Sequence, residues 1–234
     1  MPRLGIIAGS AFLHGPAPRG TRPEVVSTDR GEVSVHRGEG FVFLRRHGEE
    51  RYRPPHRLPH HAHALALEVL GVEGAVGLSS VGSLRIELEQ GTAVVPEDYL
   101  SFHPPPTFAG DERLHIVPAL DEGLRGMLLD AARDTDGPVR DGGVYAETRG
   151  PRFETRAEVR MLATHADVVG MTAASEATLL QERGIPYAVL GMVDNLAHGI
   201  GGETLSLGAF DRALERSRGR ARAILDEILK RNEP

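Results

Sequence analysis

The chain has 234 residues, of which 40% are hydrophobic and 26% charged, a composition typical of a globular protein with one core. It contains no cysteine, which excludes disulfides, thiolate nucleophiles and cysteine-based zinc sites and fits a cytoplasmic location. The net charge is -6, with arginines scattered among acidic residues, so we expect no nucleic-acid partner, because such proteins need a basic surface.

The chain begins with a short apolar run, Leu4 to Ala8, which predicts a buried strand. Neither this run nor any later one is long enough for a signal-peptide core or a membrane span, and we expect a soluble protein without a membrane partner. We predict strands at 4–8, 41–44, 72–78, 91–95, 143–148, 167–172 and 185–193, and helices at 61–70, 120–133, 154–164, 173–183 and 207–230. The segment 96–113, rich in proline and polar residues, is predicted to be a loop.

This alternation of strands and helices is typical of an α/β domain. The sequence shows no internal repeat and no interdomain linker. We therefore predict that residues 1–234 form a single domain with a central mixed, largely parallel β-sheet flanked by helices.

Four of the predicted strands end in residues suited to binding an anion. They are Gly9-Ser10, Arg46-His47, Ser79-Ser80 and Met171-Thr172. Ligands of α/β sheets bind beyond the carboxyl ends of the strands. Small residues let backbone N–H groups approach an anion, and a guanidinium matches a tetrahedral oxyanion in a bidentate way. These ends predict a phosphate pocket assembled from separate segments, whereas the absent Walker and dinucleotide motifs argue against a nucleoside triphosphate or NAD site.

Five segments carry a resemblance to a known family. They are Gly5–Ser10, Arg46–Gly48, Ser79–Leu84, Gly150–Thr155 with Ala157-Glu158, and Asp167–Thr172 with Glu176-Ala177. In order and spacing they resemble the trimeric purine nucleoside phosphorylase family, which includes the methylthioadenosine and methylthioinosine phosphorylases. The likeness covers nearly the whole chain.

The resemblance implies a nucleoside phosphorylase-like fold and phosphorolysis of the N-glycosidic bond of purine nucleosides. The products would be a purine base and ribose 1-phosphate or its 5-methylthio form. It further implies a cytoplasmic homotrimer that uses inorganic phosphate as co-substrate and needs no metal or organic cofactor.

The resemblance also implies roles for individual residues. Phosphate would be held by Ser10, Arg46, His47, Ser79, Ser80 through its backbone, and Thr172, with Ser79 between phosphate and sugar. Met171 would lie under the ribose, Phe153 would stack on the purine, and Glu154 would accept the N1 proton of a 6-oxopurine. From the residues alone, Phe153 is equally a core aromatic and Glu154 an acid that stabilises a helix N-terminus.

Asn195 is the second residue predicted to be catalytic, because family members carry at this strand end the residue that meets the leaving purine. Members preferring 6-aminopurines tend to have Asp there and a second Asp two positions later, where this chain has Ala197. An amide can donate to N7 and face a 6-oxo group, whereas a carboxylate must first be protonated. The chain thus leans toward hypoxanthine or guanine as leaving group, although Asp194 stands where relatives often have Thr.

The segment Leu205–Phe210 resembles the apolar stretch that lines the 5′ pocket of methylthio-nucleoside members. Leu207 and Phe210 suit a methylthio group better than a hydroxyl, which needs a partner when buried; a role in helix core explains them equally well. Inosine, guanosine and 5′-methylthioinosine are therefore candidate substrates. The alternatives are a 5′-methylthioadenosine phosphorylase, a nucleoside hydrolase on the same scaffold, and a purine-binding protein without turnover.

Four histidines lie close together in the sequence, at positions 56, 60, 61 and 63. His56 and His60 have helical i, i+4 spacing, but no HExxH pattern is present and Pro59 interrupts a helix. We therefore predict no metal site. Relatives tend to carry Asn and Tyr around His60, so this stretch departs from the common pattern.

Overall fold

The computed structural model describes residues 3–111, 114–202 and 207–232, with the side chains of 207 and 209–211 outside the description. The strands are β1 (Leu4–Ala8), β2 (Arg22–Thr28), β3 (Gly31–Arg37), β4 (Phe41–Arg45), β5 (Gly74–Ser83), β6 (Ala93–Val95), β7 (Asp98–Ser101), β8 (Val139–Asp141), β9 (Val144–Glu147), β10 (Val168–Gly170) and β11 (Tyr187–Leu196). The α-helices are α1 (His60–Val69), α2 (Glu122–Arg133), α3 (Arg156–Leu162), α4 (Ala173–Glu182) and α5 (Leu207–Arg231), and short 3-10 turns span Ser10–Phe12, Pro55–Arg57 and Ile200–Gly202.

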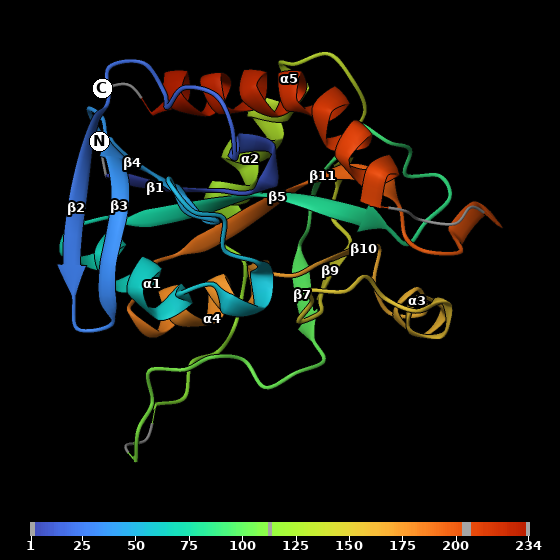
Figure 1. Ribbon diagram of the computed structural model, residues 1–234, viewed down its shortest axis with the longest axis horizontal. Coiled ribbons are helices and arrows are strands. Elements are labelled where there is room, and N and C mark those ends of the chain that lie inside the picture. The colour runs from blue at the N-terminus through green and yellow to red at the C-terminus, as the bar shows by residue number, and fades with distance from the viewer. Residues whose placement is uncertain (1–2, 112–113, 203–206, 233–234) are drawn as a thin grey trace.

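All these strands join one mixed sheet with helices on both sides (Figure 1). Its main path runs β2-β3-β4-β1-β5-β10-β9-β7, while β11 pairs with β5 and β6, and β6 with β8. Six of the ten pairings among described residues are parallel, and four are antiparallel. The predicted α/β architecture with a mixed, largely parallel sheet is confirmed.

Two apolar cores hold the helices against the sheet, one on each face. The first gathers residues of α1 and α4, such as Leu67 and Leu179, and the second gathers residues of α2 and α5, such as Leu128 and Ile224. Figure 1 places α1 and α4 together on one side and α2 and α5 on the other. A third, smaller core packs α3 against β9 and β10.

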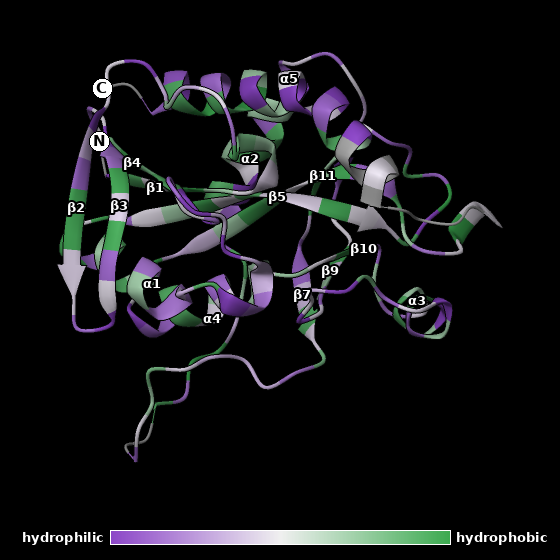
Figure 2. Ribbon diagram, viewed as in Figure 1, coloured by the Kyte–Doolittle hydropathy of each residue, from purple (hydrophilic) through white to green (hydrophobic). Residues whose placement is uncertain are grey.

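The long helix α5 is amphipathic, as predicted, and green and purple alternate along it in Figure 2. Ile224, Leu225 and Ile228 are fully buried on its inner side. Within the described part of the chain, no helix has both the length and the apolar character that crossing a membrane requires.

Four strands were absent from the prediction. The β2–β3 hairpin pairs antiparallel at the edge of the sheet, with most of its residues exposed or half-buried. Strand β7 lies inside the predicted loop 96–113 and pairs parallel with β9, and β8 pairs with β6. These strands are short or polar on both faces, so the apolar pattern that marks a buried strand is missing. The loop prediction was wrong at Asp98–Ser101.

Strand β5 continues to Ser83, five residues past the end predicted at Leu78. Its extension is paired on both sides, parallel with β11 up to Leu196 and antiparallel with β10 at Gly82 and Ser83. The predicted end at Leu78 was too early, because neighbouring strands supply partners for the backbone of the small residues that follow. The pairing holds Ser79 and Ser80 in fixed positions.

Candidate active site

A cavity of about 190 Å³ lies at the ends of β1, β4, β5, β10 and β11. It is lined by Ser10, Arg46, His47, Tyr52, Pro55, Ser79, Ser80, Val81, Gly82, Pro151, Phe153, Glu154, Val169, Gly170, Met171, Thr172, Asn195 and Ala197. Ten of the twelve predicted site residues are in this set. The other two, Leu207 and Phe210, have side chains outside the described part, as does the whole of Leu205-Ser206.

A larger cavity of about 480 Å³ adjoins the first and shares Arg46 and Tyr52 with it. It is lined mainly by charged residues of the segment 45–57, and Arg46 is the one predicted site residue it contains. We therefore place the candidate site in the smaller cavity, where the predicted residues converge.

The convergence follows from strand direction. β4, β1, β5 and β11 run parallel to one another, so their carboxyl ends meet at one edge of the sheet. β10 runs against the last residues of β5, which brings Met171 and Thr172 to the same edge. Ser10, Arg46 and Asn195 thus come together although they lie far apart in the chain.

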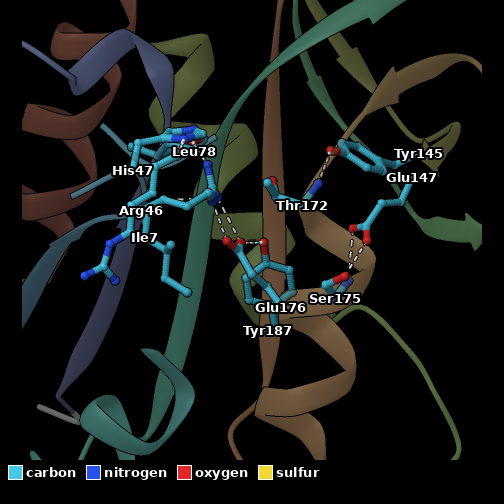
Figure 3. A network of polar contacts seen from close by, with 11 residues as sticks. Ile7, Arg46, His47, Leu78, Tyr145, Glu147, Thr172, Ser175, Glu176 and Tyr187 are labelled. Atoms are coloured by element: carbon cyan, nitrogen blue, oxygen red, sulfur yellow. Dashed lines mark hydrogen bonds and ion pairs between the residues drawn. The ribbon is translucent and has the colours of Figure 1, made fainter. Parts of the chain in front are cut away.

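Arg46 forms the centre of a buried polar network at one end of the cavity (Figure 3). Its Nε donates to one oxygen of Glu176, and its Nη2 donates to the other at 2.9 Å. The hydroxyl of Tyr187 donates to the same carboxylate at 2.7 Å. Burial lowers the pKa of Arg46, but the charge and the hydrogen bond of Glu176, together with smaller contributions from Tyr187 and Tyr145, raise it above its usual value, so Arg46 stays protonated.

This network fixes one edge of the Arg46 guanidinium. The Nε–Nη2 edge is occupied by Glu176, because a buried guanidinium without a partner is strongly unfavourable. Nη1 lies on the other side, where it donates to the carbonyl of Leu78 at 3.2 Å. Nη1 is thus the part of Arg46 nearest Gly9 and the loop that carries Ser10.

Gly9 is required by this approach. A Cβ at position 9 would lie 2.5 Å from Nη1 of Arg46 and 2.7 Å from the carbonyl oxygen of Leu78. Both distances are too short for any side chain, so the glycine after β1 lets the guanidinium reach the edge of the cavity. The Gly-Ser pair is therefore more than an ordinary turn.

His47 lies beside Arg46 and is neutral. Burial, together with the positive charge of Arg46, lowers its pKa to about 4. Its Nδ1 is 2.9 Å from the carbonyl oxygen of Arg53, which can only accept, so Nδ1 carries the proton. Nε2 is therefore an acceptor, and it suits the protonated oxygen of a partly protonated oxyanion. Tyr52 stacks on the imidazole, with ring centroids 5.3 Å apart.

Thr172 is the N-cap of α4, so the positive end of that helix dipole is at the cavity. The helix start is held from the far side by the buried carboxylate of Glu147, which accepts from the backbone N–H of Ser175 at 3.0 Å and from its hydroxyl. The backbone N–H of Thr172 is 3.4 Å from the hydroxyl of Tyr145. We call the set Ser10, Arg46, His47, Ser80 and Thr172 the Arg46 end of the cavity.

Phe153, Glu154, Asn195 and Ala197 also line the cavity, and we call this set the Asn195 end. The amide nitrogen of Asn195 donates to the carbonyl of Leu196 at 2.8 Å. An amide nitrogen carries two N–H groups, so a second donor is left for a ligand. Position 197 offers a methyl group rather than a carboxylate, so the second acid typical of members that prefer 6-aminopurines is absent from the cavity.

Glu154 is nearly buried, and the hydroxyl of Thr148 donates to one of its oxygens. The helix predicted to start at Glu154 begins at Arg156 instead. Thr155 is the N-cap, and it forms a capping box with Glu158, which is therefore the acid that stabilises the helix start. The alternative interpretation of Glu154 as a helix-terminal acid loses its support.

Met171 also lines the cavity. Gly150, in the segment that leads to Phe153, has a positive φ of 61°. A Cβ there would also lie 2.5 Å from the sulfur of Met171. The backbone conformation therefore favours glycine at this position, and a larger residue would also displace the side chain of Met171.

Glu176 was not predicted to be a site residue. It was noted within a motif, but no chemistry was assigned to it. A signal was present, because Glu176 is a carboxylate inside the otherwise apolar or small-residue run 173–180. A buried acid requires a partner, but nothing in the sequence indicates that the partner is Arg46.

The four clustered histidines do not share one helix. His56 lies in the 3-10 turn before Pro59, and α1 begins at His60. His63 is buried, and burial lowers its pKa well below the usual range, so it is neutral. Among the residues that the structure describes, no group of three or more His, Asp or Glu side chains is placed to hold a metal ion.

Comparisons with known proteins identify the family to which the chain is similar. Residues 3–230 match the model of the Phosphorylase superfamily. The chain is 38% identical over 236 residues to a probable 6-oxopurine nucleoside phosphorylase of Archaeoglobus fulgidus, covering 97% of this chain and 96% of that one. It is 39% identical over 184 residues to a probable S-methyl-5'-thioinosine phosphorylase of Xylella fastidiosa, covering 73% and 76%. A solved methylthioadenosine phosphorylase of Schistosoma mansoni, in complex with adenine, superposes with a TM-score of 0.88 at 25% identity, covering 98% of this chain and 91% of that one.

Proposed function

The chain belongs to the Phosphorylase superfamily, and from that premise we propose that it is an enzyme that cleaves purine nucleosides with inorganic phosphate. The observation that carries the proposal is the convergence of Ser10, Arg46, His47 and Thr172 at one end of a cavity whose other end holds Phe153, Glu154 and Asn195. A cationic end beside an aromatic and amide end fits an oxyanion beside a purine.

The reaction breaks the bond between C1′ of the sugar and N9 of the purine. The bonding electrons leave on the purine, the sugar passes through an oxocarbenium-like state, and a phosphate oxygen forms the new bond to C1′. The Arg46 end holds phosphate in line for this attack, and such positioning supplies much of the rate. At the other end, Asn195 donates a hydrogen bond to N7, which stabilises the negative charge developing on the base. Glu154 accepts a hydrogen bond from N1–H of a 6-oxopurine, which orients the base.

A leaning toward 6-oxopurines follows from Asn195 and Ala197. The amide donates to N7 without prior protonation, which a carboxylate at position 195 would require. The relative that covers 97% of this chain is named as a probable 6-oxopurine nucleoside phosphorylase, which supports the same preference. Hypoxanthine and guanine are thus the proposed leaving groups.

The sugar remains a choice between ribose and 5-methylthioribose. Leu207 and Phe210 were predicted to line the 5′ pocket, but their side chains lie outside the described residues. Two of the similar proteins are named for methylthio-nucleosides. We therefore propose inosine, guanosine and 5′-methylthioinosine as substrates, with 5′-methylthioadenosine as the alternative.

We also propose that the enzyme is a cytoplasmic homotrimer that requires neither a metal nor an organic cofactor. The trimer is supported by the resemblance to trimeric purine nucleoside phosphorylases. A cytoplasmic location is supported by the lack of cysteine. Sedimentation tests whether the enzyme is a trimer. An activity assay after treatment with a chelator tests whether it needs a metal.

The experiment that tests the proposal measures free base released from inosine with and without phosphate. We expect release to depend on phosphate and to yield a sugar phosphate. Equal release without phosphate would identify a hydrolase, and tight binding without release would identify a purine-binding protein; either result rejects the proposal. A panel of inosine, guanosine, adenosine and their 5′-methylthio forms then identifies the preferred substrate.

A further inference from the structure

Two helices of this protein start at a threonine, and the two starts are capped in different ways. Thr155 is the N-cap of α3, and its hydroxyl accepts from the backbone N–H of Glu158 at 3.2 Å. This is the usual role of a threonine at a helix start. Thr172 is the N-cap of α4, but its side chain makes no such hydrogen bond. The equivalent N–H in α4, three residues after the cap, belongs to Ser175 and is bound by a different residue.

That residue is Glu147, the last residue of β9. Its side chain is buried. One of its oxygens accepts from the backbone N–H of Ser175 at 3.0 Å, and the other accepts from the hydroxyl of Ser175. Figure 3 shows Glu147 and Ser175 on the side of Thr172 that faces away from Arg46. Glu147 thus satisfies the helix N–H group that an N-cap side chain would otherwise satisfy.

The carboxyl group of Glu147 is ionised. His103, in the loop after β7, has Nε2 at 3.1 Å from Oε1 of Glu147 and Nδ1 at 3.1 Å from the carbonyl oxygen of Pro104. An oxygen near each ring nitrogen favours the doubly protonated imidazolium, and the contact with Glu147 raises the pKa of His103. Burial raises the pKa of Glu147, but its contacts with His103 and Ser175 outweigh burial and lower that pKa. Both oxygens of Glu147 are therefore acceptors.

The two threonines also differ in backbone conformation. Thr155 has a ψ of 160°, in the extended region typical of an N-cap. Thr172 has a ψ of -28° and lies outside that region. Thr172 is thus not arranged to cap its own helix, and it lines the cavity instead.

Resting on the proposed function, we propose that Glu147 is a positioning residue for phosphate: it caps α4 in place of Thr172 and leaves the Thr172 hydroxyl to donate to a phosphate oxygen. A capping hydroxyl must lie about 3 Å from the N–H that it accepts from, and this fixes its place over the helix end. Glu147 removes that requirement. Glu147 is absent from the described lining of the cavity, so it acts through Thr172 and not on the substrate.

The test compares Glu147→Ala with Glu147→Gln. In Glu147→Ala, the N–H of Ser175 loses its acceptor, and the hydroxyl of Thr172 turns to cap the helix. We expect the KM for phosphate to rise about tenfold or more, the size of effect expected for one hydrogen bond to a charged group, while the KM for inosine stays within about twofold. The amide oxygen of Glu147→Gln still accepts from Ser175, so its KM for phosphate should stay within about threefold of wild type.

The matched control is Glu158→Ala, which removes the carboxylate at the start of α3. It should leave the KM for phosphate unchanged, because the hydroxyl of its N-cap, Thr155, has no part in binding phosphate. A rise equal to that of Glu147→Ala would show that any weakened helix start impairs phosphate binding, and it would overturn the inference.

Two double mutants separate positioning from general damage. In the Thr172→Ala background, Glu147→Ala should add no further increase in the KM for phosphate, because the group through which it acts is gone. Proline is tolerated in the first turn of a helix and has no N–H to satisfy. Ser175→Pro combined with Glu147→Ala should therefore restore the wild-type KM for phosphate, and also folding if Glu147→Ala alone fails to fold.

Four results would overturn the inference. They are an unchanged KM for phosphate in Glu147→Ala, equal losses in Glu147→Ala and Glu147→Gln, additive losses in the Thr172→Ala background, and no restoration by Ser175→Pro. The KM for inosine and kcat are measured in the same series, so that a general loss of activity is distinguished from a loss of phosphate binding.

The proposed function is tested separately in the same experiment. Phosphate-dependent base release by the wild-type chain establishes the reaction whatever the variants do. If the wild type shows no dependence on phosphate, the proposed function itself fails. If the wild type depends on phosphate and the variants do not follow the expected order, only the role of Glu147 fails.

Discussion

The two ends of the cavity are built in different ways. At the Arg46 end, the charged groups are buried and paired: Arg46 with Glu176, and Glu176 also with Tyr187. At the Asn195 end, the polar groups are neutral or singly partnered: Asn195 donates to Leu196, and Glu154 accepts from Thr148. The first end depends on contacts between distant elements, whereas the second depends on a strand end and a loop.

This difference indicates a division of labour. Phosphate is the same in every reaction of this type, so the residues that bind it do not need to accommodate different ligands, and their charged groups can be held in fixed pairs. The base varies among nucleosides, and an end with few mutual contacts can change one residue without disturbing the rest. The Arg46 end should therefore respond to substitution mainly in stability and phosphate binding, and the Asn195 end in specificity.

The largest effect is expected from Glu176→Ala, which leaves Arg46 as an unpaired buried charge. Removing one partner of a buried pair costs about 3–5 kcal/mol in the free energy of unfolding, measured by urea denaturation. The matched control is Glu68→Ala, whose partner Arg183 and own side chain are both about one-third exposed; this change should cost less than about 1 kcal/mol. Similar losses of the free energy of unfolding in the two variants would contradict the prediction that the buried Arg46–Glu176 pair contributes more to stability than a part-exposed ion pair.

The second effect is a loss of stability in acid, which we expect from His47 at the Arg46 end. His47 has a folded pKa of about 4 against a usual value of 6.5, so between these values the unfolded chain binds the proton more readily than the folded one. The free energy of unfolding therefore falls as pH drops from about 6.5 to about 4, by at most about 1.4 kcal/mol per pH unit for this group. His47→Gln should flatten that dependence in urea titrations; a slope equal to wild type would refute the assignment.

Thr172→Ala should affect phosphate more than nucleoside. Losing one hydrogen bond to a charged group costs about 1.5–3 kcal/mol, which is roughly 10- to 150-fold in the KM for phosphate, while the KM for inosine stays within about twofold. The control is Thr178→Ala in the same helix, where the hydroxyl binds the carbonyl of Ala174 away from the cavity. Equal changes in both KM values would contradict the placement of phosphate at this end.

The smallest effect on stability is expected from Asn195→Asp, which should instead change substrate specificity. The new carboxylate favours a 6-amino group, and we expect the ratio of kcat/KM for inosine to that for adenosine to fall about tenfold, which corresponds to about 1.4 kcal/mol. Urea denaturation should show little change, since Asn195 is half-buried. A variant that keeps the wild-type ratio would place the base elsewhere in the cavity.

Much of the site followed from local sequence patterns. Gly9-Ser10 and Met171-Thr172 were predicted as strand ends because a buried apolar run was followed by small or hydroxyl residues, and both lie at the cavity. No local pattern indicated that Glu176, 130 residues away, takes the Nε–Nη2 edge of Arg46. The contact of Glu147 with the start of α4 was equally invisible, because it joins residues 28 positions apart.

The sequence by itself determined the α/β class, the order of most strands and helices, the family, and ten of the residues that line the cavity. These features depend on hydrophobic periodicity and on short motifs, which are local properties of the chain. Only the tertiary structure decided which charges are paired, that β5 continues past Leu78, and that Glu147 holds the start of α4. Those features depend on burial and on partners contributed by distant segments, and a carboxylate or a guanidinium has no fixed role until folding selects its neighbours.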